Sequence, residues 1–231
     1  MGGISIGLGG SQKELLHVKD NLAAHFRNEI VSGRLRPGEN IVEVQWAKTL
    51  GVSQSSVREA LNILSAEGFV QKGSGQIAQV TKLSDEDIQH SYELRAVLEG
   101  YVARVVAKRK LDLSDLDQSI ADMRSAIDCK NIQAFYERDL QFHFLLAEKS
   151  GNKMLQQAVK RILLPLFAFV VIRVYGGRVS DEQWNKSLER HQRIVDALKS
   201  GDPVYAEHLV IETIYSFRDE TNDVLNPAKH V

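Results

Sequence analysis

Helical spacing of apolar residues runs through most of this 231-residue chain, and no other feature limits its fold as strongly. From Leu83 onward we find no strand pattern, only about six amphipathic segments separated by Gly, Ser, Asn or Pro. These segments cover residues 84–109, 114–129, 132–149, 153–175, 181–199 and 203–225. We therefore predict an all-α helical bundle over residues 84–226.

The first third of the chain follows a different pattern. The Gly-rich residues 1–13 are predicted to be a flexible tail, and residues 14–81 a small α+β domain. Residues 69–80 contain two short alternating runs around Gly73 and Gly75, which predicts a β-hairpin. Three helical segments come before the hairpin, at about 14–34, 43–50 and 54–67. The chain is thus predicted to be mainly α, with two domains of different class.

The second and third of these helices have the spacing of a helix-turn-helix. Gly51 permits the left-handed residue of a tight turn, and Ser53 stands where it can cap the next helix. The small Ala47 and Ala60 let the two helices cross closely. Short or forked hydrogen-bonding groups follow the cap, and such groups suit base edges and phosphates. The predicted DNA-contacting residues, with the hairpin as a wing, are Ser53, Gln54, Ser55, Ser56, Arg58, Lys72 and Gly75.

The net charge of −1 at first argues against a nucleic-acid partner. When the chain is divided at residue 83, the N-terminal part has 9 Lys and Arg against 7 Asp and Glu, a net +2, and the remainder has 20 against 23, a net −3. This asymmetry permits a DNA-binding N-terminal domain whose affinity depends on salt. The alternative is an ordinary pair of helices beside a hairpin, with no DNA partner.

Polar side chains interrupt the apolar stripes of four predicted helices, at Arg95, Asp139, His143, His191 and Thr213. An Asp in an apolar stripe is costly to bury unless it is paired or bound to a metal, and Asp139 and His143 have the i, i+4 spacing that suits two metal ligands. Together the five residues predict a buried polar cavity that is a ligand or metal site. Singly, each has a structural interpretation, such as a core histidine bonded to backbone or an arginine paired with the Glu four residues further on.

Composition excludes several other classes of protein. The single cysteine, Cys129, cannot form an internal disulfide, which favours an intracellular protein. The start of the chain lacks a signal-peptide pattern, and no apolar run approaches the ~20 residues of a membrane span. A hydrophobic content of 43% argues against global disorder. We expect a cytoplasmic protein without a membrane partner.

Three runs in the first domain are Leu50-Gly51-Val52-Ser53, Val57-Arg58-Glu59-Ala60-Leu61 and Glu67-Gly68-Phe69-Val70. Together they resemble the winged-helix domain of GntR-family transcriptional regulators, which implies an operator-DNA partner. The chain departs from the family pattern at three places. Gln54-Ser55-Ser56 stands where Arg-Thr-Pro is common, Val44 replaces an arginine, and Ser74-Gly75 replaces an Arg-Gly pair in the wing.

Four pieces of the second domain are Glu93-Leu94-Arg95, Asp139 with Phe142-His143, Ser150-Gly151-Asn152, and His191 with Gly201-Asp202. They resemble the FCD effector domain of the FadR subgroup of GntR regulators. Many such domains bind a divalent metal through one Asp and three His, and the resemblance gives Asp139, His143 and His191 the first three positions. The fourth position is Thr213, a weak ligand for zinc or nickel, so metal affinity is expected to be lower or absent.

The resemblance also implies that Arg95 binds the carboxylate of a small organic or sugar acid, for which its forked guanidinium is suited. The predicted effector site consists of Arg95, Asp139, His143, Asn152, His191 and Thr213.

These observations predict a homodimeric, ligand-responsive transcriptional repressor that is not an enzyme. The dimer follows from the resemblance and from operator symmetry. Two alternatives remain open for the helical domain. It is either a structural dimerisation module without a ligand, or a metal-dependent enzyme that acts on a small carboxylate.

Overall fold

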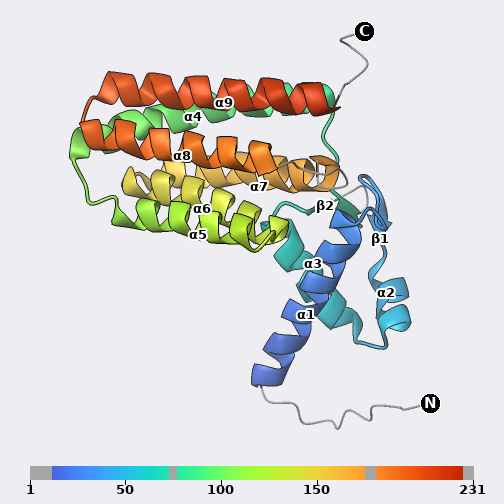
Figure 1. Ribbon diagram of the computed structural model, residues 1–231. Coiled ribbons are helices and arrows are strands. Elements are labelled where there is room, and N and C mark those ends of the chain that lie inside the picture. Colours follow the sequence, from blue (N-terminus) through green and yellow to red (C-terminus); the bar gives the residue numbers. More distant parts are fainter. Residues whose placement is uncertain (1–11, 73–76, 175–180, 226–231) are drawn as a thin grey trace. The chain divides into compact units, whose positions relative to one another are not determined.

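A computed structural model describes residues 12–72, 77–174 and 181–225 (Figure 1). The chain forms two compact units, Met1–Lys82 and Leu83–Val231, which are described separately below. Within the described residues, no helix is both long enough and apolar enough to cross a membrane.

The first unit contains three helices and a small antiparallel sheet among its described residues. The helices are α1 (Gln12–Val31), α2 (Glu43–Leu50) and α3 (Gln54–Ala66), and the strands are β1 (Asn40–Ile41), β2 (Val70–Lys72) and β3 (Ala78–Val80). The predicted hairpin is confirmed by the pairing of β2 with β3, in which Val70 faces Val80. The strand β1, which the sequence did not predict, pairs with the other edge of β3 and gives the order β1-β3-β2.

The predicted turn between α2 and α3 is confirmed in detail. Gly51 adopts a left-handed conformation with φ of 66°, and the Ser53 hydroxyl accepts a hydrogen bond from the backbone N–H of Ser56. The apolar stripe of α3 is buried at Val57, Ala60, Leu61 and Leu64. These contacts fix the first turn of α3, with its polar side chains, at the surface.

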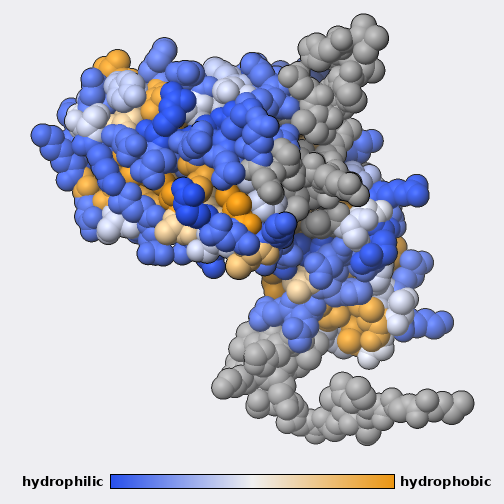
Figure 2. Space-filling view, in the orientation of Figure 1, coloured by the Kyte–Doolittle hydropathy of each residue, from blue (hydrophilic) through white to orange (hydrophobic). Residues whose placement is uncertain are grey.

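The second unit is all-helical over its described residues, as predicted. Its helices are α4 (Asp85–Arg109), α5 (Ser114–Asp128), α6 (Ile132–Lys149), α7 (Lys153–Val174), α8 (Asp181–Ser200) and α9 (Pro203–Leu225). In Figure 1, α9 lies along α4 and α5 lies along α6. Both α7 and α8 contact helices of each pair, so they join the bundle around one apolar core. Figure 2 shows hydrophilic side chains over most of the face in view, with hydrophobic ones visible between α8 and α5.

Two local features position α4. A capping box starts the helix, because Ser84 accepts from the backbone of Asp87 while the Asp87 carboxylate accepts from the backbone of Ser84. Further along, Gly100 allows α9 to approach closely, since a Cβ at this position would lie 2.8 Å from Cγ1 of Ile211. The close packing of α4 against α9 therefore depends on a residue without a side chain.

A proline interrupts the hydrogen bonding of α7. Pro165 lies inside this helix and has no N–H to donate to the carbonyl of Arg161, four residues earlier. The part of α7 that follows the proline is buried at Leu166, Phe167 and Val170. The helix thus lacks one backbone hydrogen bond directly before this buried segment.

Candidate functional site

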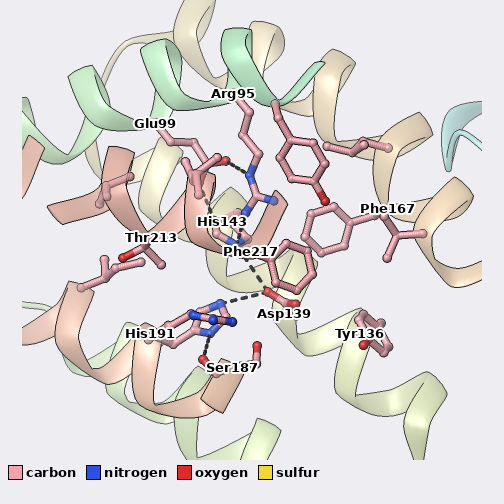
Figure 3. Close-up of a pocket in the computed structure, with 17 residues that line it drawn as sticks. Arg95, Glu99, Tyr136, Asp139, His143, Phe167, Ser187, His191, Thr213 and Phe217 are labelled. Atoms are coloured by element: carbon pink, nitrogen blue, oxygen red, sulfur yellow. Dashed lines mark hydrogen bonds and ion pairs between the residues drawn. The ribbon is translucent and has the colours of Figure 1, made fainter. Parts of the chain in front are cut away.

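A cavity of about 40 Å³ lies inside the helical unit and is lined by residues of α4, α6, α7, α8 and α9. Arg95 and Glu99 come from α4, Asp139 and His143 from α6, and His191 from α8, and their side chains point toward one another (Figure 3). All five are buried. Apolar side chains, including Tyr92, Leu166, Phe167, Val170, Ile194 and Val210, complete the lining.

Arg95 is at the centre of the first group of contacts. Its Nε donates to Oε1 of Glu99 at 2.7 Å, and its Nη2 lies 2.8 Å from Nε2 of His143. Because a guanidinium only donates, this second contact requires an unprotonated Nε2 in His143. The other ring nitrogen of His143, Nδ1, lies 2.5 Å from Oε2 of Glu99. The Arg95 side chain also lies over the ring of Phe167, with its Cζ atom 5.3 Å from the ring centroid.

Asp139 is at the centre of the second group. Its Oδ1 lies 2.9 Å from Nε2 of His191 and 3.3 Å from Nε2 of His143. The other ring nitrogen of His191, Nδ1, lies 2.7 Å from the carbonyl oxygen of Ser187. A carbonyl only accepts, so Nδ1 of His191 carries the proton and, in a neutral ring, Nε2 presents a lone pair to Asp139.

The facing oxygen and nitrogen atoms of Asp139, His143 and His191 are suited to bind a metal ion. Among the described residues, Asp139 Oδ1 and His191 Nε2 are buried and have no hydrogen-bond partner of acceptable geometry, although they lie close together. Asp139, His143 and His191 each offer one ligand atom, and the three atoms lie within 4.8 Å of one another. A carboxylate and two imidazoles are a donor set that suits zinc and similar divalent ions, and the backbone bond at Nδ1 orients His191 as in many metal sites.

Both buried carboxyl groups are held ionised. Burial alone raises the pKa of Glu99, but the charge of Arg95 and the contact with His143 outweigh it and lower this pKa to about 2. Burial likewise raises the pKa of Asp139, and the contacts with His191 and His143 outweigh it, so the pKa of Asp139 lies well below its usual range. The cavity therefore presents fixed negative charge beside the Arg95 guanidinium.

Thr213 lines the same cavity from α9, at the position where the resemblance gave the fourth ligand. Its hydroxyl donates to the carbonyl of Leu209 at 2.7 Å and is therefore engaged with its own helix. His208, the nearest histidine earlier in α9, is exposed and is not part of the lining.

Asn152 is the one predicted effector residue that the structure does not bring to the cavity. Its side chain is exposed, and its Oδ1 accepts from the backbone N–H of Met154 and Leu155 at the start of α7. Asn152 thus acts as a helix cap, which explains an Asn directly before a helix without any ligand.

Sequence reasoning left several lining residues out of the site, Glu99, Tyr136 and Phe167 among them. Glu99 was considered only as a partner for Arg95, and its i, i+4 spacing was the available signal. Tyr136 and Phe167 also line the cavity, but aromatic residues on a buried stripe give no sign of facing a cavity rather than the core.

At the start of α3, the cap residue Ser53 and the helix residues Gln54, Ser55 and Arg58 are exposed, and Ser56 is half-buried. The Ser53 hydroxyl lies 2.8 Å from the hydroxyls of Ser55 and Ser56. The backbone of Lys72 belongs to β2, while Gly75 lies outside the described residues.

A winged helix-turn-helix joined to a helical unit with a cavity that contains buried polar side chains defines a class, that of ligand-responsive, DNA-binding transcriptional regulators. Residues 18–80 match the gntR family of bacterial regulatory proteins and residues 90–215 match the FCD domain, and the chain belongs to the GntR family.

Curated relatives and a solved structure agree with this assignment. The probable D-xylose utilization operon transcriptional repressor of Paenarthrobacter nicotinovorans is 27% identical, over 84% of this chain and 84% of the relative. The gluconate operon transcriptional repressor of Bacillus licheniformis is 26% identical, over 78% of this chain and 75% of the relative. The structure of E. coli McbR/YncC shares the fold with a TM-score of 0.70 at 18% identity, covering 92% of this chain and 98% of that one.

Proposed function

We propose that the helical unit senses a small organic or sugar acid at the cavity, with a divalent metal bound by Asp139, His143 and His191. Ligand binding would change the operator affinity of a homodimeric repressor. The observation that carries the proposal is the approach of Asp139 Oδ1 and His191 Nε2 without a hydrogen bond, directly beside Arg95. Two relatives are named for the D-xylose and gluconate operons, which supports a sugar-derived effector.

The size of the cavity supports a conformational response. A volume of about 40 Å³ has room for a metal ion and a few waters, since one water occupies roughly 10–15 Å³ by this measure. A sugar acid is larger, so side chains from several helices must move to admit it. An effector that binds only the opened arrangement shifts the bundle toward that arrangement.

The effector assignment is tested by thermal shift with small carboxylates, each with and without zinc or nickel. We expect that at least one acid raises the melting temperature of the wild type and that this effect is lost in Arg95→Lys. The substitution keeps the positive charge but removes the paired N–H donors of the guanidinium. Arg104→Ala is the matched control, because Arg104 is also on α4 but pairs with Glu207 at the surface. An acid that stabilises the Arg95 variant as much as the wild type would exclude Arg95 as its partner.

The metal assignment is tested by elemental analysis of protein purified without chelator. We expect bound metal in the wild type and in His208→Ala, and a loss of this metal in His143→Ala. His208 is an exposed histidine of the same unit and controls for adventitious binding. A wild-type protein without metal would favour a site that binds the acid alone.

An exposed apolar stripe on α4 supports the homodimer. Leu94, Val97 and Tyr101 are 45%, 63% and 50% exposed, and their spacing places them along one side of the helix. Operator recognition by two helix-turn-helix heads requires two copies of the chain. Val97→Asp should therefore yield monomers in analytical ultracentrifugation, while Met154→Asp, at an exposed apolar residue of α7, should not.

A second candidate function is a purely structural core network. It is favoured by the mutual pairing of Arg95, Glu99 and His143, which gives each of these side chains a partner without any ligand. Under this alternative, neither metal nor carboxylate would alter the melting temperature.

A further inference from the structure

A single carboxylate joins the two longest polar side chains at the start of α3. Glu43, the first residue of α2, accepts from Arg58 Nε at 3.1 and 3.0 Å and from Arg58 Nη2 at 2.7 Å. The same carboxylate accepts from Nε2 of Gln54 at 3.0 Å. Both partners are exposed on the helix whose first turn is predicted to contact DNA, and Glu43 was not among the predicted DNA-contacting residues.

The contact determines which edge of Arg58 is available. Glu43 binds the edge formed by Nε and Nη2. The edge formed by Nη1 and Nη2 remains for a base, and two parallel N–H donors match the O6 and N7 acceptors of guanine in the major groove.

Gln54 is fixed in a similar way. A carboxylate only accepts, so the amide must turn its NH₂ group toward Glu43, and its Oε1 takes no part in this contact. The Oε1 atom can accept from the amino group of adenine or cytosine, and the second N–H of the amide remains available as a donor.

We propose that Glu43 is a positioning residue for sequence recognition, which holds Arg58 to read a guanine and Gln54 to read an amino group in each operator half-site. The inference rests on DNA binding by α3. It adds a specificity role for a residue that carries the same charge as DNA. Through its negative charge, Glu43 also opposes contacts of Arg58 with phosphates, which favour every sequence equally.

The alternative is that Glu43 only ties α2 to α3. An exposed ion pair of this kind contributes little to stability, because solvent screens it. Arg58 and Glu43 have side-chain exposures of 58% and 27%, so the pair is largely open to water. A structural role and a positioning role therefore differ in what they predict for sequence selectivity.

The test compares Glu43→Gln with Glu29→Gln. Glu29 forms a closely similar exposed pair in the same unit, accepting from Arg34 Nε at 2.9 Å and Nη2 at 2.8 Å. Each protein selects duplexes from a random 24-base-pair library, where 24 is roughly two turns of DNA. Fluorescence anisotropy then gives the affinities for the selected duplex and for a scrambled duplex at several salt concentrations.

We expect the wild type and Glu29→Gln to select a guanine at one fixed position in each half-site. Glu43→Gln should lose this preference, with about a tenfold smaller ratio of selected to scrambled affinity, and should bind the scrambled duplex more tightly than the wild type. In an Arg58→Ala background, Glu43→Gln should change the ratio little further, since Glu43 acts through Arg58.

Two results would overturn the inference. One is an unchanged guanine preference in Glu43→Gln, and the other is a loss of selectivity that simply adds to that of Arg58→Ala. Selection of no sequence by the wild type would reject recognition by α3 itself and the role of Glu43 with it. In a Trp184→Phe background, fluorescence of Trp46, which packs on Phe26 with ring centroids 5.1 Å apart, reports in each variant whether the unit is folded.

Discussion

Two arginine–glutamate pairs use the same chemistry in opposite surroundings. In the first unit Arg58 and Glu43 meet at 2.7 Å with side-chain exposures of 58% and 27%. In the second unit Arg95 and Glu99 also meet at 2.7 Å, but their exposures are 6% and 2%. The interatomic distance therefore does not distinguish the roles of the two ion pairs, whereas their burial does.

The difference in burial separates two uses of charge. A solvated pair contributes little to stability, so its charges can turn to another partner, such as a base, at small cost. Buried charges cannot lose a partner without a large penalty, so their arrangement stays fixed until a ligand or metal replaces the contact. Under these proposals, the exposed charges of the first unit are available to contact DNA, whereas the buried charges of the second unit select a ligand or metal.

The largest effect is expected from removing one partner of the buried pair. Glu99→Ala leaves Arg95 buried without its carboxylate, which should lower the free energy of unfolding of the helical unit by about 3–5 kcal/mol. The chain has only two tryptophans, and Trp184 lies in this unit, so urea unfolding followed by its fluorescence in a Trp46→Phe background isolates the effect. A loss below about 1 kcal/mol would mean that the pair is effectively solvated.

Protonation of Glu99 should weaken its ion pair with Arg95 gradually as the pH falls, whereas Glu99→Ala removes the pair completely. The folded-state pKa of Glu99 is about 2, below its ordinary value of 4.5, so Glu99 contributes stability above pH 4.5 that is lost as the pH falls toward 2. Asp139 acts in the same direction, since its pKa is lowered too. Urea unfolding of chelator-treated protein between pH 6 and pH 2 should show a continuing decrease below pH 4.5. A flat profile there would contradict the lowered pKa of Glu99.

A packing change beside Glu99 should have an intermediate effect. Gly100→Ala places a Cβ against Ile211 of α9 and should cost about 1–3 kcal/mol through overpacking. The Trp184 assay applies here as well. Adding Ile211→Ala should recover part of the loss, and the absence of any recovery would show that steric pressure is not the cause.

The smallest effect on stability is expected at the exposed pair. Glu43→Gln should change the free energy of unfolding of the first unit by less than about 1 kcal/mol, measured through Trp46 in a Trp184→Phe background. A loss as large as that from Glu99→Ala would erase the distinction between the two pairs.

Much of the fold was predictable because local signals agree with tertiary packing. The expected helices match α2 to α9 within about two residues, since caps and glycines mark their ends. The strand β1 was missed because Asn40–Ile41 is too short to show any period. The helical unit was also predicted to contain a buried polar cavity, because polar residues on several inward stripes must meet in a bundle.

What the sequence could not supply was pairing between distant residues. Glu43 and Arg58 are 15 positions apart, across a turn, and no periodic pattern relates them. Asn152 was assigned to the effector site through the resemblance, yet an Asn before a helix is explained by capping alone. Which ring nitrogen of His143 faces Arg95 likewise depends on side-chain geometry that no spacing encodes.

The proline in α7 affects how the cavity would respond to ligands of different size. A helix that lacks a backbone hydrogen bond bends there at lower cost, and Pro165 stands directly before Leu166 and Phe167 of the cavity wall. One wall of the cavity is therefore compliant, while the wall formed by α4, which contains no proline, is stiff. Molecules of equal charge but different bulk would press this compliant wall outward by different amounts, so the cavity would distinguish its occupants by volume as well as by charge.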